Sequence, residues 1–199
     1  MAIYLIRHGE TALNASGVMQ SPETPLSENG LAQAERLAAR MLDEGIAHIL
    51  ASDYARAAMT AAAVQRATGV ALESEPLLRE RNLGDLRGRA YSELDFDPFA
   101  EGYSPPNGER WEAFHERVDR AWEQVAALAT RVDGNLAVVT HGLVCRSVVM
   151  RLAEAGEAPA SGYGWFNTSV TILDREPPFK VRLLNCARHL EDAELKGPA

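Results

Sequence analysis

Short, nearly continuous apolar runs alternate with amphipathic stretches along this chain. The runs at 2–6, 46–51 and 136–140 have the length and composition of strands that are buried on both faces of a parallel sheet. A further strand is expected at 70–74, just after Gly69. Strands that alternate with helical segments in this way indicate an α/β protein.

The segments between these runs have apolar residues at three- and four-residue steps, which is typical of helices that turn one stripe toward a core. The expected helices cover 27–43, 54–68, 108–131 and 143–155. Ser27 is placed to cap the first of them, and the last is expected to end near Gly156.

The C-terminal part predicts an antiparallel edge to the sheet. Residues 168–174 and 179–184 have the pattern of two strands joined across 176–178, and the proline- and glycine-rich segment 97–108 predicts a long surface loop. No repeat or linker is visible, so we expect a single domain over 1–199. Its predicted fold is a three-layer α/β/α sandwich with a mostly parallel central sheet and an antiparallel edge.

Composition and charge indicate the cellular compartment of the protein and exclude some classes of partner. A chain of 199 residues with 46% hydrophobic residues can bury a sizeable core, and its net charge of -8 offers no broad footprint for nucleic acid or anionic lipid. Cys145 and Cys186 lack the CxxC spacing of a metal or redox site, which suits a reducing compartment. The opening MAIYLI has neither the basic segment of a signal peptide nor the length of a membrane span. We therefore expect a cytoplasmic protein that acts on a small molecule, without nucleic acid or membrane partners; a homodimer is compatible with these features.

Two of the predicted strands end in the same way, with LIRHG at 5–9 and VVTHG at 138–142. The carboxyl ends of parallel strands meet at one edge of a sheet, so we expect His8 and His141 to lie close together. Arg7 precedes the first histidine, and Gly142 begins the helix after the second. A guanidinium, imidazoles and the N–H groups of a helix N-terminus together form an anion site that suits phosphate.

Other phosphate and hydrolase signatures are missing. The sequence contains no GxxxxGK[ST], no GxGxxG after a strand, no HExxH and no GxSxG. Carboxylates do not cluster in the sequence as a hard metal ion would require. We therefore expect neither a metal nor a cofactor.

Longer motifs give the anion site a specific resemblance. They are RHGETALN at 7–14, ETPLSENGLAQA at 23–34, SDYARAAMTA at 52–61, LRERNLGDLRG at 78–88 and VVTHG at 138–142. In this order they resemble the histidine phosphatase superfamily, the phosphoglycerate mutase-like family, from residue 3 to about 145. The resemblance implies the fold predicted above and a phosphoryl transfer through a phosphohistidine.

The resemblance also implies a role for each matching residue. His8 would be the nucleophile, and Glu80 would be the general acid and base, with a pKa raised by burial or by bound phosphate. The other residues expected at the site hold the phosphoryl group or the substrate: Arg7, Arg56 and His141 among the catalytic residues, and Asn14, Arg81, Gly142 and Leu143 among the substrate-binding ones.

Three functions remain open at this stage. A phosphatase of small phosphate monoesters is favoured, because glycolytic mutases of the family carry additional segments before the second catalytic histidine. The Glu80-Arg81 pair followed by Gly84 and Gly88 resembles the pattern of a 2,3-bisphosphoglycerate-dependent phosphoglycerate mutase, which is the alternative. An inactive phosphate-binding module is less favoured, since none of the expected catalytic residues is missing.

Four arginines crowd the segment beside Glu80, namely Arg79, Arg81, Arg87 and Arg89. They either form a salt-bridged surface loop or receive a second anionic group of the substrate. Arg81, next to Glu80, is the best candidate for the second role.

Overall fold

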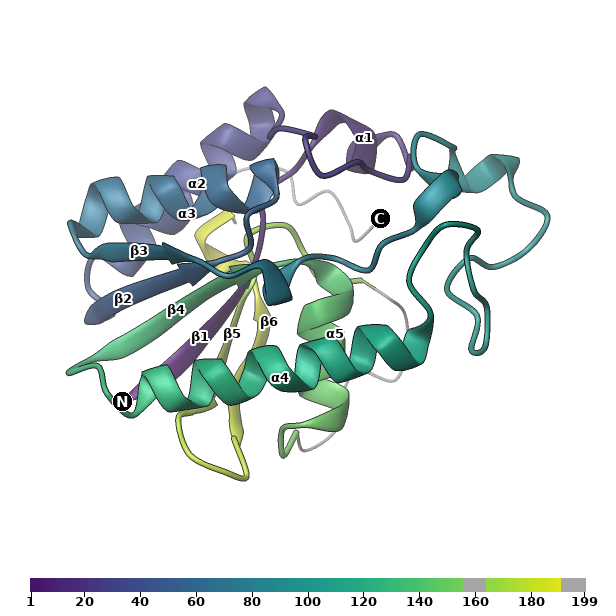
Figure 1. Cartoon of the computed structure of the whole chain (residues 1–199). Coiled ribbons are helices and arrows are strands. Elements are labelled where there is room, and N and C mark those ends of the chain that lie inside the picture. The colour runs from purple at the N-terminus through teal and green to yellow at the C-terminus, as the bar shows by residue number, and fades with distance from the viewer. Residues whose placement is uncertain (156–163, 191–199) are drawn as a thin grey trace.

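The computed structural model describes residues 1–155 and 164–190, and in them a six-stranded sheet forms the centre of the fold (Figure 1). The strands lie in the order β3-β2-β4-β1-β5-β6. Their bounds are β1 Ala2–Arg7, β2 Ile46–Ala51, β3 Ala71–Ser74, β4 Asn135–Thr140, β5 Val170–Asp174 and β6 Val181–Cys186. β3, β2, β4 and β1 run parallel, whereas β5 and β6 pair antiparallel at the edge. The predicted sheet, including its antiparallel edge, is confirmed.

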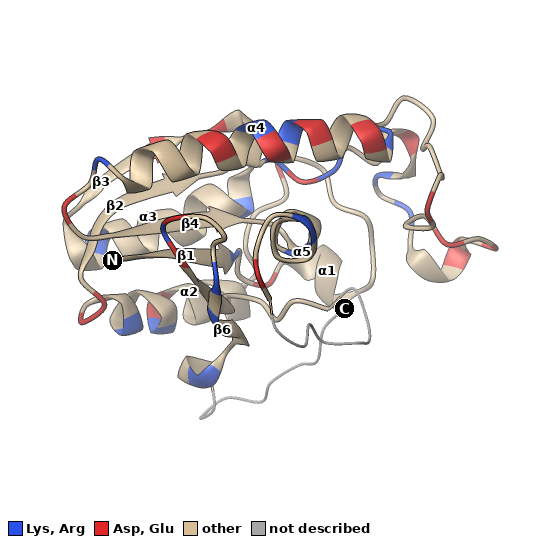
Figure 2. Ribbon diagram, turned by 90° about the horizontal axis from the view of Figure 1, so that it is seen from below, with Lys and Arg blue, Asp and Glu red and all other residues tan. Residues whose placement is uncertain are grey.

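Helices cover both faces of this sheet (Figures 1 and 2). α2 (Glu28–Met41) and α3 (Ala55–Thr68) lie on one face, and α4 (Trp111–Ala129) and α5 (Gly142–Arg151) lie on the other. Successive side chains of a strand point to opposite faces, so the apolar run of β1 serves two cores. Ile3 and Leu5 pack with α4 and α5, while Tyr4 and Ile6 pack with α2 and α3. This is the predicted three-layer sandwich.

Local chemistry sets the helix boundaries. The Ser27 hydroxyl accepts a hydrogen bond from the Gly30 N–H at 3.0 Å, which confirms the predicted cap of α2. α3 ends at Gly69, whose φ of 72° is the left-handed conformation that favours glycine. α4 begins later than predicted, because Glu109 uses its backbone elsewhere: its N–H binds the Asn82 carbonyl, and its own carbonyl accepts from Arg81.

The prediction for the end of α5 was wrong by one turn. The helix ends at Arg151, and the chain then turns toward the β5–β6 hairpin. The Glu154 N–H donates to the Pro178 carbonyl, and the Glu154 carbonyl accepts from Val181 N–H. These bonds replace the helical ones, and Gly156, where the end was expected, lies outside the described residues.

The carboxyl end of β1 is held tightly against α2. A Cβ on Gly30 would lie 1.9 Å from the Glu10 carbonyl oxygen, and one on Gly9 would lie 2.7 Å from the Gly30 carbonyl oxygen. The Glu10 carboxylate accepts hydrogen bonds from Ser27 and Asn29. Backbone thus contacts backbone where β1 ends, which fixes the position of the residues beside Gly9.

Loops close over this end of the sheet. A short helix, α1 (Ala12–Ala15), follows a capping box between Thr11 and Asn14 that the sequence analysis did not identify. Segment 97–108 has no helix or strand, as predicted. A small apolar cluster of Met19, Leu83 and Leu86 joins these loops to each other.

Candidate active site

The two histidines that follow β1 and β4 lie side by side. Arg7 is the register partner of Thr140, so the residues after them emerge at the same height of the sheet. The ring centroids of His8 and His141 are 5.1 Å apart in an edge-to-face arrangement. His8 is 2% exposed and His141 is fully buried. The sequence pattern of the two strand ends predicted this meeting.

The hydrogen bonds of His8 determine which ring nitrogen carries the proton. Its Nδ1 lies 2.7 Å from the Gly9 carbonyl oxygen, and a carbonyl can only accept, so Nδ1 carries the hydrogen. Its Nε2 accepts a hydrogen bond from Nε of Arg56 at 3.2 Å. Burial lowers the pKa of His8 well below its ordinary value, and the charges of Arg56 and Arg7 lower it further. His8 is therefore a neutral imidazole with its lone pair on Nε2.

Buried cations surround this nitrogen. Arg56 lies in the first turn of α3, where its other contact is the Ser21 carbonyl at 2.9 Å. Arg7 packs beside Gly142 at the start of α5 and donates to the Trp165 carbonyl. Among the residues that the structure describes, Nε of Arg7 is buried without a hydrogen-bond partner. Such a donor is expected to find a ligand.

His141 also has a ring nitrogen without a hydrogen-bond partner in the part of the chain that the structure describes. Its Nε2 lies 2.8 Å from the Ser52 hydroxyl, and its Nδ1 is buried with no partner among the described residues. Burial lowers the pKa of His141 well below its usual value, and Arg56 and His8 lower it further. His141 is therefore neutral, and it is held by Ser52 behind the first histidine.

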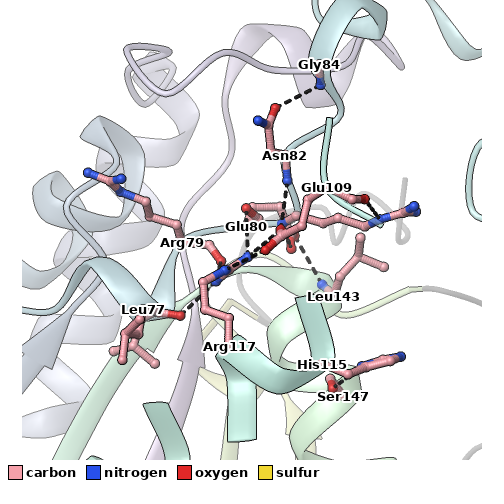
Figure 3. Close-up of polar contacts among 12 residues, drawn as sticks. Leu77, Arg79, Glu80, Asn82, Gly84, Glu109, His115, Arg117, Leu143 and Ser147 are labelled. Atoms are coloured by element: carbon pink, nitrogen blue, oxygen red, sulfur yellow. Dashed lines mark hydrogen bonds and ion pairs between the residues drawn. The ribbon is translucent and has the colours of Figure 1, made fainter. Parts of the chain in front are cut away.

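Glu80 faces the same place from a segment that crosses above β4 (Figure 3). Its carboxylate accepts from the Leu143 N–H at 3.1 Å and from the Arg81 N–H at 3.0 Å. Burial nevertheless raises its pKa, because the cost of a buried charge exceeds the help from these N–H groups and the nearby arginines. The predicted upward shift of the pKa is confirmed.

Arg117 of α4 holds the Glu80 segment in place (Figure 3). It donates to the carbonyls of Leu77 and Arg79 at 2.7 Å each and to that of Glu80 at 3.4 Å. Its guanidinium also forms a two-pronged pair with the Glu109 carboxylate. One residue of α4 thus binds three backbone carbonyls within residues 77–80, next to the carboxyl group.

These groups meet at a cavity of about 350 Å³. Its wall combines the polar groups described above with an apolar side, and the lining residues are Arg7, His8, Asn14, Gln20, Tyr54, Arg56, Glu80, Arg81, Leu83, Arg87, Tyr91, Asp97, Pro98, Phe99, Gly142 and Leu143. Every residue expected at the site is in this wall except His141, whose ring contacts that of His8 edge to face. The volume is that of a pocket for a small molecule.

Two of the expected contacts with substrate are used differently in the structure. The Leu143 N–H points to Glu80, where the sequence analysis expected it near the transferred phosphoryl group. Arg81 is 2% exposed and donates to the carbonyls of Glu109, Pro98 and Tyr103. Its guanidinium also stacks 3.9 Å from the Trp111 ring centroid. Arg81 therefore fixes the 97–110 segment rather than presenting a free charge to the cavity.

Several residues of the site were not predicted. Ser52 binds His141, and Asn167 links two sides of the site: its Nδ2 donates to the His8 carbonyl at 3.1 Å, and its Oδ1 accepts from Asn14. Arg87 was named only as one of four crowded arginines. Arg117 and Asn167 could not be identified from the sequence, because each binds a residue more than thirty positions away. A local motif does not predict such a contact.

No group of three or more His, Cys, Asp or Glu suited to holding a metal ion is found within 1–155 and 164–190. In the described part of the chain, no helix combines the length and the hydrophobicity needed to cross a bilayer.

Comparison with known proteins decides the family. The sequence model of the histidine phosphatase superfamily (branch 1) matches residues 3–186. This chain belongs to that superfamily. It is 32% identical over 153 residues to a protein of Yersinia pestis (strain Pestoides F) named "Probable phosphoglycerate mutase GpmB", a match that covers 72% of this chain and 70% of that protein.

Solved structures of this superfamily have the same fold. Bacillus stearothermophilus YhfR superposes with a TM-score of 0.81 at 30% identity, covering 95% of this chain and 98% of that one. Mycobacterial glucosyl-3-phosphoglycerate phosphatase, solved with VO3, has a TM-score of 0.75 at 25% identity and covers 91% and 95%. The similar proteins thus carry the names of both mutases and phosphatases.

Proposed function

We propose that this superfamily member is a phosphatase that hydrolyses small-molecule phosphate monoesters through a phosphohistidine on His8. The observation that carries the proposal is the state of that imidazole. Nδ1–H donates to the Gly9 carbonyl, and the lone pair is on Nε2, which accepts from Nε of Arg56 until a phosphoryl oxygen takes over that donor. A neutral imidazole held in one orientation is ready to attack phosphorus.

In the first step, Nε2 of His8 forms a bond to phosphorus while the bond from phosphorus to the ester oxygen breaks. Glu80 gives its proton to that oxygen, and the alcohol leaves. Arg7 and Arg56 hold the transferring oxygens, where negative charge spreads in a loose transition state. The raised pKa of Glu80 supports this role, because only the protonated carboxyl group can donate.

In the second step, water replaces the alcohol. The Glu80 carboxylate takes a proton from the water as its oxygen attacks phosphorus, the bond from phosphorus to Nε2 breaks, and phosphate is released. Each residue returns to its starting protonation state, so no cofactor is consumed.

Replacement of His8 tests the proposal. With p-nitrophenyl phosphate as substrate, His8→Ala is expected to lower kcat on the order of 10⁴-fold or more, since the nucleophile itself is lost. Rapid quenching with ³²P-labelled ester should trap acid-labile phosphate on the wild-type chain and none on the variant. His48→Gln is the matched control, because His48 lies on β2 and is absent from the cavity wall. Equal rates in wild type and His8→Ala would refute the proposal.

Phosphoglycerate mutase activity is the alternative, and the name of the Yersinia relative favours it. A mutase must retain a bisphosphorylated intermediate, whereas a phosphatase must admit water to its phosphoenzyme. The length of the chain supports the phosphatase, because glycolytic mutases of the family carry additional segments before the second catalytic histidine, here His141. The decisive assay follows 3-phosphoglycerate with 2,3-bisphosphoglycerate as primer: release of phosphate is expected, and rapid isomerisation with little release would reverse the choice.

A further inference from the structure

The four arginines beside Glu80 differ in what they contact. Arg79 forms an ion pair with Asp53, Arg81 donates to three carbonyls, and Arg89 reaches a carbonyl at 3.5 Å from the surface. Within residues 1–155 and 164–190, the Arg87 guanidinium makes neither a hydrogen bond nor an ion pair. It is the member of this cluster that no hydrogen bond or ion pair in the described residues holds in place, although its charge helps to lower the pKa of the exposed Glu23.

Arg87 also has the right position to act on a substrate. It is half-buried and lines the cavity that contains His8. Its segment lies against the segment of Gln20, another lining residue, through a bond from the Gly88 N–H to the Met19 carbonyl at 2.8 Å. Its charge is felt at the centre of the site: the pKa of Arg56 is lowered to about 10, first by burial and then also by Arg7 and Arg87.

The charges in the cavity do not balance when a phosphate monoester alone is bound. The wall holds four arginines, Arg7, Arg56, Arg81 and Arg87. Opposite them stand Asp97 and the two charges of the phosphate, while Glu80 carries a proton in the first step, so one positive charge is left over. The other carboxylate of the wall, Asp97, accepts the Phe99 N–H at 2.8 Å and caps the loop. Arg87 shares a neighbouring groove with the exposed Glu23, whose pKa it helps to lower, but it forms no ion pair with that carboxylate in the described residues. A second anion bound in the cavity would therefore give this half-buried cation a closer partner.

The apolar part of the wall includes Leu83, Pro98 and Phe99. Such a wall suits a short carbon skeleton, and a cavity of about 350 Å³ holds a metabolite of a few carbons with two charged ends. We propose that Arg87 is a specificity-determining residue that receives a second anionic group, a carboxylate or a second phosphate, on the leaving portion of the substrate. This inference rests on the proposed phosphatase function and names the class of its substrate.

The test compares esters that share a phosphate and differ in the charge of the alcohol. The anionic set is 3-phosphoglycerate, 2-phosphoglycerate and 2,3-bisphosphoglycerate; glycerol 3-phosphate is neutral in its leaving portion, and phosphoethanolamine is cationic. Wild-type kcat/KM should favour at least one anionic ester over glycerol 3-phosphate by about tenfold or more, as a charge-assisted pair allows. Preference for glycerol 3-phosphate or phosphoethanolamine over every anionic ester would overturn the proposal.

Variants then assign the preference to the residue. Arg87→Gln should reduce the ratio of kcat/KM for the best anionic ester to that for glycerol 3-phosphate by about 10- to 100-fold, and Arg87→Lys by less. Arg89→Gln is the matched control, because Arg89 is exposed and outside the cavity wall, and it should leave the ratio unchanged. A change of less than threefold in Arg87→Gln, with the fold intact by circular dichroism, would contradict the assignment.

Failure of this inference is distinguishable from failure of the proposed function. If p-nitrophenyl phosphate is hydrolysed and His8→Ala abolishes the reaction, the phosphatase stands whatever the ratio shows. If no phosphate ester is turned over at all, the proposed function fails and the substrate class fails with it.

Discussion

The surroundings of Glu80 and its proposed role as general acid both favour a protonated carboxyl group. Burial raises its pKa, although two N–H groups and two arginines favour its charged form. A general acid must be protonated when the ester oxygen leaves, so a raised pKa widens the pH range in which the first step can run. The balance between burial and hydrogen bonding at this single carboxyl group thus sets the working pH of the site.

Replacing this carboxyl group should affect poor leaving groups most. Glu80→Gln is expected to lower kcat/KM for glycerol 3-phosphate by about 10²- to 10⁴-fold and that for p-nitrophenyl phosphate far less, since nitrophenolate leaves without a proton. In the wild type, kcat/KM for glycerol 3-phosphate should fall as pH rises above the raised pKa of Glu80, because the acid is then deprotonated. The pH–rate profiles of both proteins check this. Survival of the alkaline limb in Glu80→Gln would assign it to another group.

Some residues of the site could be placed from the sequence and others could not. His8 and His141 could be paired in advance, because the ends of two adjacent parallel strands leave little freedom. Adjacency to Glu80 favours Arg81 over Arg87 as the receiver of a second anionic group, but both lie in irregular turns where spacing does not determine the direction of a side chain. The structure turns the first toward carbonyls and the second toward the cavity.

At the scale of elements, α4 joins the sheet core to the loop that bears the acid (Figure 3). Its buried face packs against β1 and β4 through Phe114, Val118 and Val125. Arg117, on the same helix, reaches over to the Glu80 segment, so the position of the carboxyl group depends on how α4 is packed. Arg117 is therefore a positioning residue in the proposed reaction.

Loss of this anchor should reduce the rate more than it weakens binding. Arg117→Gln is expected to lower kcat for glycerol 3-phosphate by about 10- to 100-fold with KM little changed, since a small displacement of an acid is costly. Arg117→Lys should restore part of the loss. Arg151→Gln is the control, because Arg151 is also ion-paired, with Asp119, but lies outside the cavity wall. Reduced stability with unchanged kcat would mean that Arg117 serves the fold alone.

Elements themselves were predictable to the extent that their apolar pattern determines them. The runs that became β1, β2 and β4 are buried on both faces, and the stripes of α2 and α4 face the two cores. Predicted helix ends were wrong where a backbone group forms its hydrogen bond with a distant residue. Glu154, for example, bonds to Pro178 and Val181 of the β5–β6 hairpin. The pairing partner of such a group depends on the assembled fold and not on the neighbouring sequence.

At the scale of the whole molecule, several histidines are buried in a form that resists protonation. Burial is the main cause that lowers the pKa of His8, His115, His141 and His189, the last to about 4. The unfolded chain binds protons on these rings as pH falls through about 6.5, whereas the folded chain does not. Folding is therefore opposed increasingly below that pH. The raised pKa of Glu80 acts in the opposite direction, but it is one group against four.

The free energy of unfolding should accordingly decrease as pH falls from 7.5 to 5.5, by up to about 1.4 kcal/mol per pH unit for each of the buried rings of His8 and His141. The partly exposed rings of His115 and His189 contribute less, because solvent screens them. Urea denaturation at fixed ionic strength measures it. His189→Gln removes a titrating ring that is absent from the cavity wall. It should reduce the slope of unfolding free energy against pH by the contribution of that one ring, whatever it does to absolute stability. A stability that stays level or increases over this interval would show that these rings accept protons within the folded chain, and the neutral His8 on which the nucleophile depends would lose its physical basis.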